Sequence, residues 1–199
     1  MYVSSFALGF HGCDESVGEK ILRGEEHLTV SDNDYDWLGS GIYFWENSPK
    51  RALHWANFIK DNPNLFENQI KKPFVVGAII DLGHCLDLME AGSLELLKVA
   101  FEEFKKNFDL VGTPLPKNEK GGQNDEDLVK RKLDCAVINY LHDLRKEKEM
   151  APFESVRGAF WEGTPVYEGA RIMAQTHIQI CVRETTNIRG YFRPIPEVS

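Results

Sequence analysis

The pattern of hydrophobic and polar residues alternates between short apolar runs and longer stretches with helical spacing. Three apolar runs in the first half are typical of buried strands and cover residues 5–10, 42–45 and 73–82. The first of these is expected to end at His11. Helices are predicted where a capping residue precedes apolar positions three and four apart, over 14–24, 49–61, from Ser93 onward and over 127–146. This mixture of strands and helices predicts an α+β fold.

The last third of the chain turns to strand patterns. A short strand is predicted over 156–160 and an edge strand, ended by prolines, over 188–194. Between them residues 176–183 alternate, so that His177, Gln179 and Cys181 share one face and aliphatic residues share the other. The aliphatic face should meet the core, whereas Gln179 should face inward or line a cleft. Polar, turn-rich stretches at 25–40 and 111–127 are predicted to be loops.

Composition narrows the class of protein. A chain of 199 residues without an internal repeat or a break in composition predicts a single domain over residues 1–199. The net charge of −8 argues against non-specific binding to nucleic acid or to anionic membranes. Four scattered cysteines without a CxxC pair favour a reducing, cytoplasmic location. No apolar run is long enough for a membrane span, and the N-terminus lacks the basic region of a signal peptide.

The stretch 35–56, YDWLGSGIYFWENSPKRALHWA, concentrates the candidate chemistry. A Gly-punctuated loop leads into a strand that carries Tyr43, and a Pro-initiated helix follows with His54 and Trp55. An aromatic ring on a strand and another on the next helix can converge on one planar guest, and ring faces attract a cation. The alternative is that these aromatics are simply core residues.

The order of three short motifs carries a resemblance. His11-Gly12 stands at the end of the first strand, Gly39–Phe44 (GSGIYF) follows, with Tyr43 placed 32 residues after His11, and a polar residue stands on a late strand. This order resembles the ADP-ribosyltransferase superfamily, in its diphtheria-toxin and poly(ADP-ribose) polymerase branch with a His-Tyr-Glu motif. The resemblance implies a split, mostly antiparallel β-sheet, and it leaves a helical segment at about 85–150 as an insertion.

The resemblance also implies roles in binding NAD. His11 would bond a ribose hydroxyl, and the Gly12 main chain would pair with the nicotinamide carboxamide, to which glycine allows close approach. Tyr43 would stack on the nicotinamide ring. The second aromatic of the family stands eleven residues later, which falls on His54, with Trp55 next to it as the stronger cation binder. The NAD-binding set implied in this way is His11, Gly12, Gly41, Tyr43, His54 and Trp55, and the catalytic set is His11, Tyr43 and Gln179.

The third motif position departs from the family, because Gln179 stands where the family has Glu. A Gln side chain can bond a ribose hydroxyl but carries no charge. Glu162 and Glu168, in the stretch before this strand, are the better candidates to replace the missing carboxylate, and Glu184 is expected to face away.

The resemblance therefore implies a bacterial mono-ADP-ribosyltransferase that uses NAD as substrate and needs no metal. It would release nicotinamide and transfer ADP-ribose to a macromolecular acceptor, protein or nucleic acid, as a toxin or phage-defence effector with a possible antitoxin partner. The alternatives are an NAD glycohydrolase and a catalytically silent module that binds NAD or a relative. A Cys13–His11 nucleophile pair is a further option on spacing alone.

Overall fold

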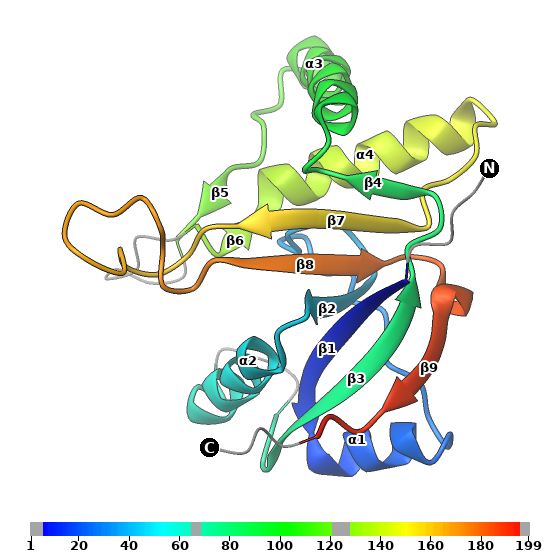
Figure 1. The fold of residues 1–199 in the computed structure, drawn as a ribbon. Helices are drawn as coiled ribbons and strands as arrows, with labels where there is room; N and C mark the ends of the chain where they lie inside the picture. Colours follow the sequence, from blue (N-terminus) through cyan, green and yellow to red (C-terminus); the bar gives the residue numbers. More distant parts are fainter. Residues whose placement is uncertain (1–5, 65–68, 121–127, 196–199) are drawn as a thin grey trace.

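The structure is a computed structural model that describes residues 6–64, 69–120 and 128–195 (Figure 1). Its strands are β1 Phe6–Asp14, β2 Ile42–Glu46, β3 Pro73–Asp81, β4 Cys85–Asp87, β5 Asn118–Glu119, β6 Lys130–Arg131, β7 Ser155–Phe160, β8 His177–Val182 and β9 Ile188–Phe192. Its helices are α1 Glu15–Leu22, α2 Pro49–Asp61, α3 Ala91–Val111 and α4 Lys132–Glu147, with a short 3-10 turn at Thr185–Asn187. This α+β architecture agrees with the sequence pattern.

Seven strands form one mixed, mostly antiparallel sheet in the order β4-β7-β8-β2-β1-β3-β9. The pair β4–β7 is parallel, and the other neighbours are antiparallel. β5 and β6 form a separate two-stranded sheet. The edge position of β9 confirms the edge strand predicted near residues 188–194.

The sheet narrows at its centre, between β1 and β2. β1 pairs with β2 at two positions, Gly9 with Glu46 and Phe10 with Trp45, but it pairs with β3 along all nine of its residues. In Figure 1 the strands β7 and β8 run across the molecule, whereas β1, β3 and β9 are steeply inclined to them. The main chains of β1 and β2 therefore separate just after Phe10, at His11 and Gly12.

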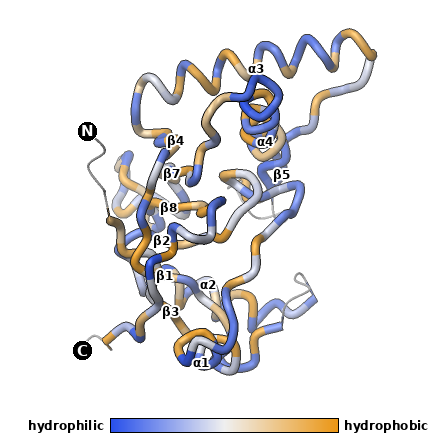
Figure 2. The backbone as a smooth tube through the Cα atoms, turned by 90° about the vertical axis from the view of Figure 1, so that its right-hand side faces the viewer, coloured by the Kyte–Doolittle hydropathy of each residue, from blue (hydrophilic) through white to orange (hydrophobic). Residues whose placement is uncertain are grey.

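Helices cover both faces of the sheet. On one face α2 packs on β1 and β2, with Ala52 buried between Phe10 and Trp45. Further along that face α4 covers β7 and β8, and α3 lies outside α4 (Figures 1 and 2). On the other face α1 packs on β3, and a second core gathers there around Phe44. Both faces of β8 are consequently buried, because Ile180 belongs to one core and Cys181 to the other.

Several predicted boundaries were wrong. β1 continues past His11 to Asp14, because its pairing with β3 extends that far, and Asp14 then caps α1 by accepting from the amide of Ser16. α3 begins at Ala91 rather than at Ser93. α4 begins at Lys132, after β6, whereas the pattern predicted a helix from residue 127, which lies outside the described residues. The segment 85–150 also contributes β4 to the main sheet, so it is not purely helical.

Among the described residues, no helix combines the length and the apolar character needed to cross a membrane.

Candidate functional site

The three residues predicted to be catalytic stand on three neighbouring strands. His11 lies on β1, Tyr43 on β2 and Gln179 on β8, and the sheet order places β2 between the other two. Gln179 lies opposite Trp45 of β2 and opposite Gly158 of β7. Positions far apart in the sequence are thus brought to the centre of the sheet, next to the separation of β1 and β2.

His11 spans that separation. Its Nδ1 lies 2.8 Å from the main-chain oxygen of Tyr43, and because a carbonyl can only accept, Nδ1–H is the donor. Burial lowers the pKa of His11, and the bond to Tyr43 opposes this shift. The imidazole is therefore neutral at pH 7, with Nε2 as its unprotonated nitrogen. The ring packs edge-on against Phe44, which places it on the face opposite to the Tyr43 side chain.

The Tyr43 hydroxyl forms hydrogen bonds to the main chain of the Gly-punctuated loop that precedes β2. Its hydroxyl donates to the main-chain oxygen of Gly39 at 2.7 Å and accepts from the amide of Leu38 at 2.8 Å. Burial raises the pKa of this phenol, so it stays protonated. The half-buried ring packs on the core that α4 covers. Tyr43 thus has a clear structural role, and the stacking role given to its ring remains a prediction.

The two candidate glycines lie in tight places. A Cβ on Gly12 would collide with the main-chain oxygen of Ala52, so glycine lets α2 pack directly on β1. A Cβ on Gly41 would collide with Cys181, and the Gly41 main chain exchanges hydrogen bonds with Ser31. Packing alone therefore explains Gly41, and its predicted part in NAD binding gains no separate support.

The structure separates the two candidates for the second aromatic. Trp55 is 37% exposed, but the centre of its ring lies 6.1 Å from that of Trp45, which is on the same face as Tyr43 and Gln179. His54 is exposed, and its ring nitrogen lies 3.3 Å from Arg51. Trp55 is consequently better placed than His54 for a guest on this face.

Glu162 lies close to the strand that carries Gln179. It is 9% exposed, and its carboxylate lies 3.0 Å from the guanidinium of Arg51, which comes from α2. The same carboxylate lies 3.5 Å from Nδ1 of His177, two residues before Gln179 on β8. Glu162 therefore brings a paired negative charge to the face that Gln179 occupies.

His177 is neutral in this setting. Burial lowers its pKa to about 4, although its hydrogen bond to the main-chain oxygen of Gln175 opposes the shift. Nδ1–H donates to that oxygen at 2.7 Å, so Nε2 is an acceptor. The positive charges of Arg51 and Arg131 lower the pKa further.

Four buried polar atoms around this cluster have no hydrogen-bond partner among the described residues: Trp45 Nε1, Arg51 Nε, Arg131 Nε and His177 Nε2. The centre of the His177 ring lies 6.5 Å from that of Trp45 and 6.1 Å from that of Trp37, on which Arg131 stacks. Arg51 joins the group through Glu162, which also lies close to His177. Three of the four atoms are donors and one is an acceptor. A buried polar atom without a hydrogen-bond partner destabilises the fold. A polar ligand that forms hydrogen bonds with these atoms would therefore be favoured on this face.

The other sequence candidates lie away from this cluster. Glu168 is exposed, and Glu184 caps the 3-10 turn by accepting from the amide and hydroxyl of Thr186. Cys13 shares the face of His11, but burial and the neighbouring Asp14 raise the pKa of its thiol to about 12. A protonated thiol is a poor nucleophile, so the Cys13–His11 alternative gains no support.

Sequence reasoning gave Arg51, Arg131 and His177 no role in the site. Arg51 stands four residues before Trp55, a spacing that places both on one side of α2. No local signal marks Arg131, because it reaches the cluster through tertiary packing. In the described part of the chain, no group of three or more His, Cys, Asp or Glu residues is arranged to hold a metal ion.

Comparison with known proteins gives one partial match. An uncharacterized protein of Methanocaldococcus jannaschii, MJ0359, is 40% identical over 55 residues, which are 28% of this chain and 25% of that protein. The chain therefore matches about a quarter of the length of this relative. No protein family model and no solved structure matches the chain.

Proposed function

We propose that the protein is a mono-ADP-ribosyltransferase that uses NAD as its substrate. The observation that carries the proposal is the placing of His11, Tyr43 and Gln179 on adjacent strands, with His11 bonded to the Tyr43 carbonyl where β1 and β2 separate. The His-Tyr-Glu resemblance gives these three residues roles around one nicotinamide-ribose unit, and their place on adjacent strands supports that use. A nicotinamide seated at the separation would meet His11 from one face of the sheet and Tyr43 and Gln179 from the other.

The reaction needs electrostatic stabilisation more than acid catalysis. Nicotinamide leaves NAD with the electron pair of the glycosidic bond, and the ribose gains oxocarbenium character. An acceptor nucleophile then forms a bond to the same carbon and loses its proton. Glu162 supplies the negative charge that stabilises the sugar cation and can take that proton, while Gln179 orients a ribose hydroxyl.

Glu162 suits this role because it is fixed in place. Arg51 holds its carboxylate at 3.0 Å, and the side chain is nearly buried. The unpartnered donors of Trp45, Arg51 and Arg131 suit a guest with many acceptor oxygens, such as a dinucleotide. The acceptor is a macromolecule, and a role as a toxin or defence effector remains an analogy with the branch.

The test is nicotinamide release from NAD by purified protein, with and without cell lysate. Wild type should release nicotinamide, Tyr43→Ala and Gln179→Ala should lose most of the activity, and Glu162→Gln should lower kcat about a hundredfold. Glu168→Gln removes a carboxylate that is exposed in the same stretch, so it should retain full activity. If wild type released no nicotinamide, with or without lysate, the proposed enzyme activity would be wrong.

Two alternatives can be read from the same experiment. The absence of Glu on β8 and the engagement of the Tyr43 hydroxyl by the loop favour a module that binds NAD without turnover. Saturable binding by calorimetry without nicotinamide release would support that module. Release of free ADP-ribose, with no label on any lysate component, would identify an NAD glycohydrolase instead.

A further inference from the structure

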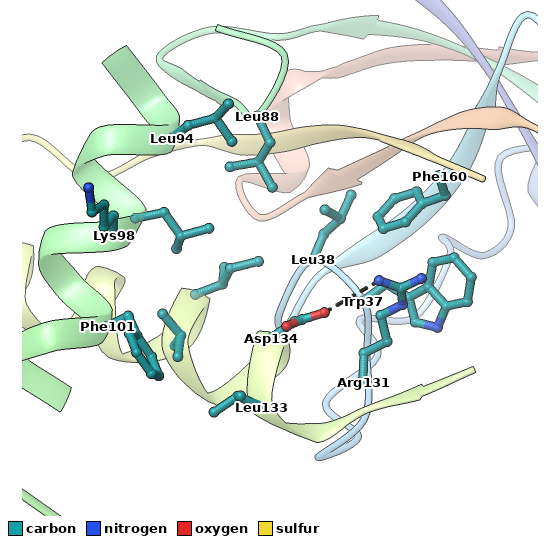
Figure 3. A pocket seen from close by; sticks show the side chains of 13 residues that line it. Trp37, Leu38, Leu88, Leu94, Lys98, Phe101, Arg131, Leu133, Asp134 and Phe160 are labelled. Atoms are coloured by element: carbon teal, nitrogen blue, oxygen red, sulfur yellow. Dashed lines mark hydrogen bonds and ion pairs between the residues drawn. The ribbon is translucent and has the colours of Figure 1, made fainter. Parts of the chain in front are cut away.

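A cavity of about 400 Å³ lies between α3 and α4 on one side and Phe160 and the Trp37–Leu38 loop on the other (Figure 3). Its size falls within the range of small-molecule sites. Most of its lining is aliphatic or aromatic and comes from Leu38, Leu94, Leu97, Phe101, Ile138 and Phe160. A guest in this cavity would therefore bury an apolar body.

One end of the cavity is polar and firmly built. The guanidinium of Arg131 stacks 4.4 Å from the centre of the Trp37 ring and lies 5.3 Å from that of Phe160. Trp37 in turn donates from Nε1 to the main-chain oxygen of Val129 at 2.8 Å, and the Arg131 amide donates to the oxygen of Tyr35. These bonds fix the polar end before any guest arrives.

The charges at the cavity favour an anion. Arg131 and Lys98 are positive and stand on opposite sides of the cavity in Figure 3, but Lys98 is mostly exposed and pairs with Glu95 at 3.9 Å, so Arg131 is the main charge. Asp134 is the one acidic lining residue, but both of its oxygens have partners: Asn118 Nδ2 at 2.9 Å and Arg131 Nη1 at 3.5 Å. Arg131 Nε is buried and has no partner. The guanidinium of Arg131 is therefore the group at this end that can still donate a hydrogen bond to a guest.

We propose that the cavity binds a small carboxylic acid with an extended apolar body. Its carboxylate would accept from the guanidinium of Arg131, whose planar fork matches two carboxylate oxygens. Its apolar body would lie between α3 and α4, against Leu97 and Phe101. The proposal does not depend on the function proposed above: Leu97 and Phe101 lie outside the proposed NAD site, and Arg131, which borders both sites, is tested here without NAD.

Calorimetry with the full chain tests the proposal, with decanoate, 1-decanol and decylamine as probes of one chain length and different charge. Decanoate should bind to a single site at least about tenfold more tightly than decanol, since a hydrogen bond to a charged group contributes on that order. Arg131→Gln should remove this preference and leave the binding of decanol unchanged. Leu97→Trp fills the cavity and should abolish binding of all three probes.

Lys130→Gln is the matched control, because it removes the exposed positive charge next to Arg131 and should retain the preference for decanoate. The proposal would be overturned if decylamine bound as tightly as decanoate or more tightly. It would also be overturned if decanoate showed no saturable binding. If Arg131→Gln does not fold, the order of the three probes in wild type and the loss in Leu97→Trp still decide. NAD takes no part in these measurements, so their outcome is separate from that of the nicotinamide assay.

Discussion

The guanidinium of Arg51 and the carboxylate of Glu162 meet at 3.0 Å, although 111 residues separate them in the sequence. Arg51 comes from α2, and Glu162 comes from the stretch that follows β7. The ion pair therefore connects α2 to the end of β7, on the face of the sheet that carries Gln179. Both side chains are largely buried, at 19% and 11% exposed. Burial lowers the pKa of Arg51, and the charge of Glu162 opposes that shift.

Removing one member of this pair should be costly. Arg51→Met removes the guanidinium that offsets the nearly buried charge of Glu162, and we expect it to lower the free energy of unfolding by about 3 kcal/mol. The double variant Arg51→Met/Glu162→Leu should regain at least half of that loss, because no uncompensated charge remains. Urea denaturation measures both.

Arg23→Met is the control for the Arg51 variant, because the ion pair of Arg23 with Glu25 is exposed, and it should leave the midpoint unchanged. An Arg51→Met variant as stable as wild type would contradict the assignment of a buried pair.

Removing the Tyr43 hydroxyl should lower the stability of the protein without a comparable loss of activity. Tyr43→Phe leaves the Gly39 oxygen and the Leu38 amide without their partner, which should cost about 1–3 kcal/mol. The ring remains, so the KM for NAD should stay within a fewfold of wild type if the ring stacks on nicotinamide. Thermal unfolding and the nicotinamide assay should be run on the same samples.

Tyr167→Phe removes a hydroxyl from an exposed ring and should leave both the unfolding temperature and the KM unchanged. Loss of NAD turnover in folded Tyr43→Phe would mean that the hydroxyl itself, rather than the ring, takes part in the reaction.

Gly12 should tolerate no side chain. The Ala52 oxygen occupies the place of a Cβ, so Gly12→Ala must displace α2 from β1, and we expect a loss of about 3 kcal/mol. Gly190→Ala on the edge strand β9 places its methyl group in open space and should be neutral or slightly stabilising. Denaturation midpoints compare the two variants directly. Equal midpoints would show that α2 does not press on β1 at this point.

Local pattern predicted the elements well, because their causes are local. The Gly-punctuated loop, the strand at Tyr43 and the Pro-initiated helix all appear near their predicted places, since turn, strand and capping signals lie within a few residues of each other. Alternation also predicted correctly that His177 and Gln179 share a face with Cys181. The first strand was expected to end too early, because its continuation past His11 depends on β3, more than sixty residues away.

The candidate site was predicted in part for the same reason. The resemblance indicated His11, Tyr43 and Gln179, and pairing between strands places them on three adjacent strands of the sheet. Sequence alone left Glu162 and Glu168 as equal candidates. Burial and the contact with Arg51 separate them, and neither can be read from spacing when the partners lie 111 residues apart. The helical pattern that predicted α4 gave no sign of a cavity, but Leu133 and Val137 line the one between α3 and α4.

Two buried histidines should make the folded protein lose stability as the pH falls. Burial lowers the pKa of His177 to about 4 and that of His142 to about 3, and the charges of Arg183 and Arg145 add to the shift at His142. In the unfolded chain a histidine titrates near ~6.5. The stabilisation from keeping them neutral is thus complete above that pH and is lost as the pH falls toward these lower pKa values.

Replacing His142 should remove part of that sensitivity. His142→Leu retains an apolar contact with Phe153 and eliminates a buried nitrogen without a partner, so its stability at pH 7 should match or exceed that of wild type. At pH 4.5, where the unfolded wild type gains a proton at residue 142 that the folded form does not, the variant should be more stable by about 2 kcal/mol. His54→Leu changes an exposed histidine and should keep the wild-type difference between the two pH values. Urea denaturation at pH 7.0 and pH 4.5 measures this difference. If His142→Leu lost as much stability between these values as wild type does, His142 would have to be charged in the folded protein, and the packing of α4 against Arg183 would need a different explanation.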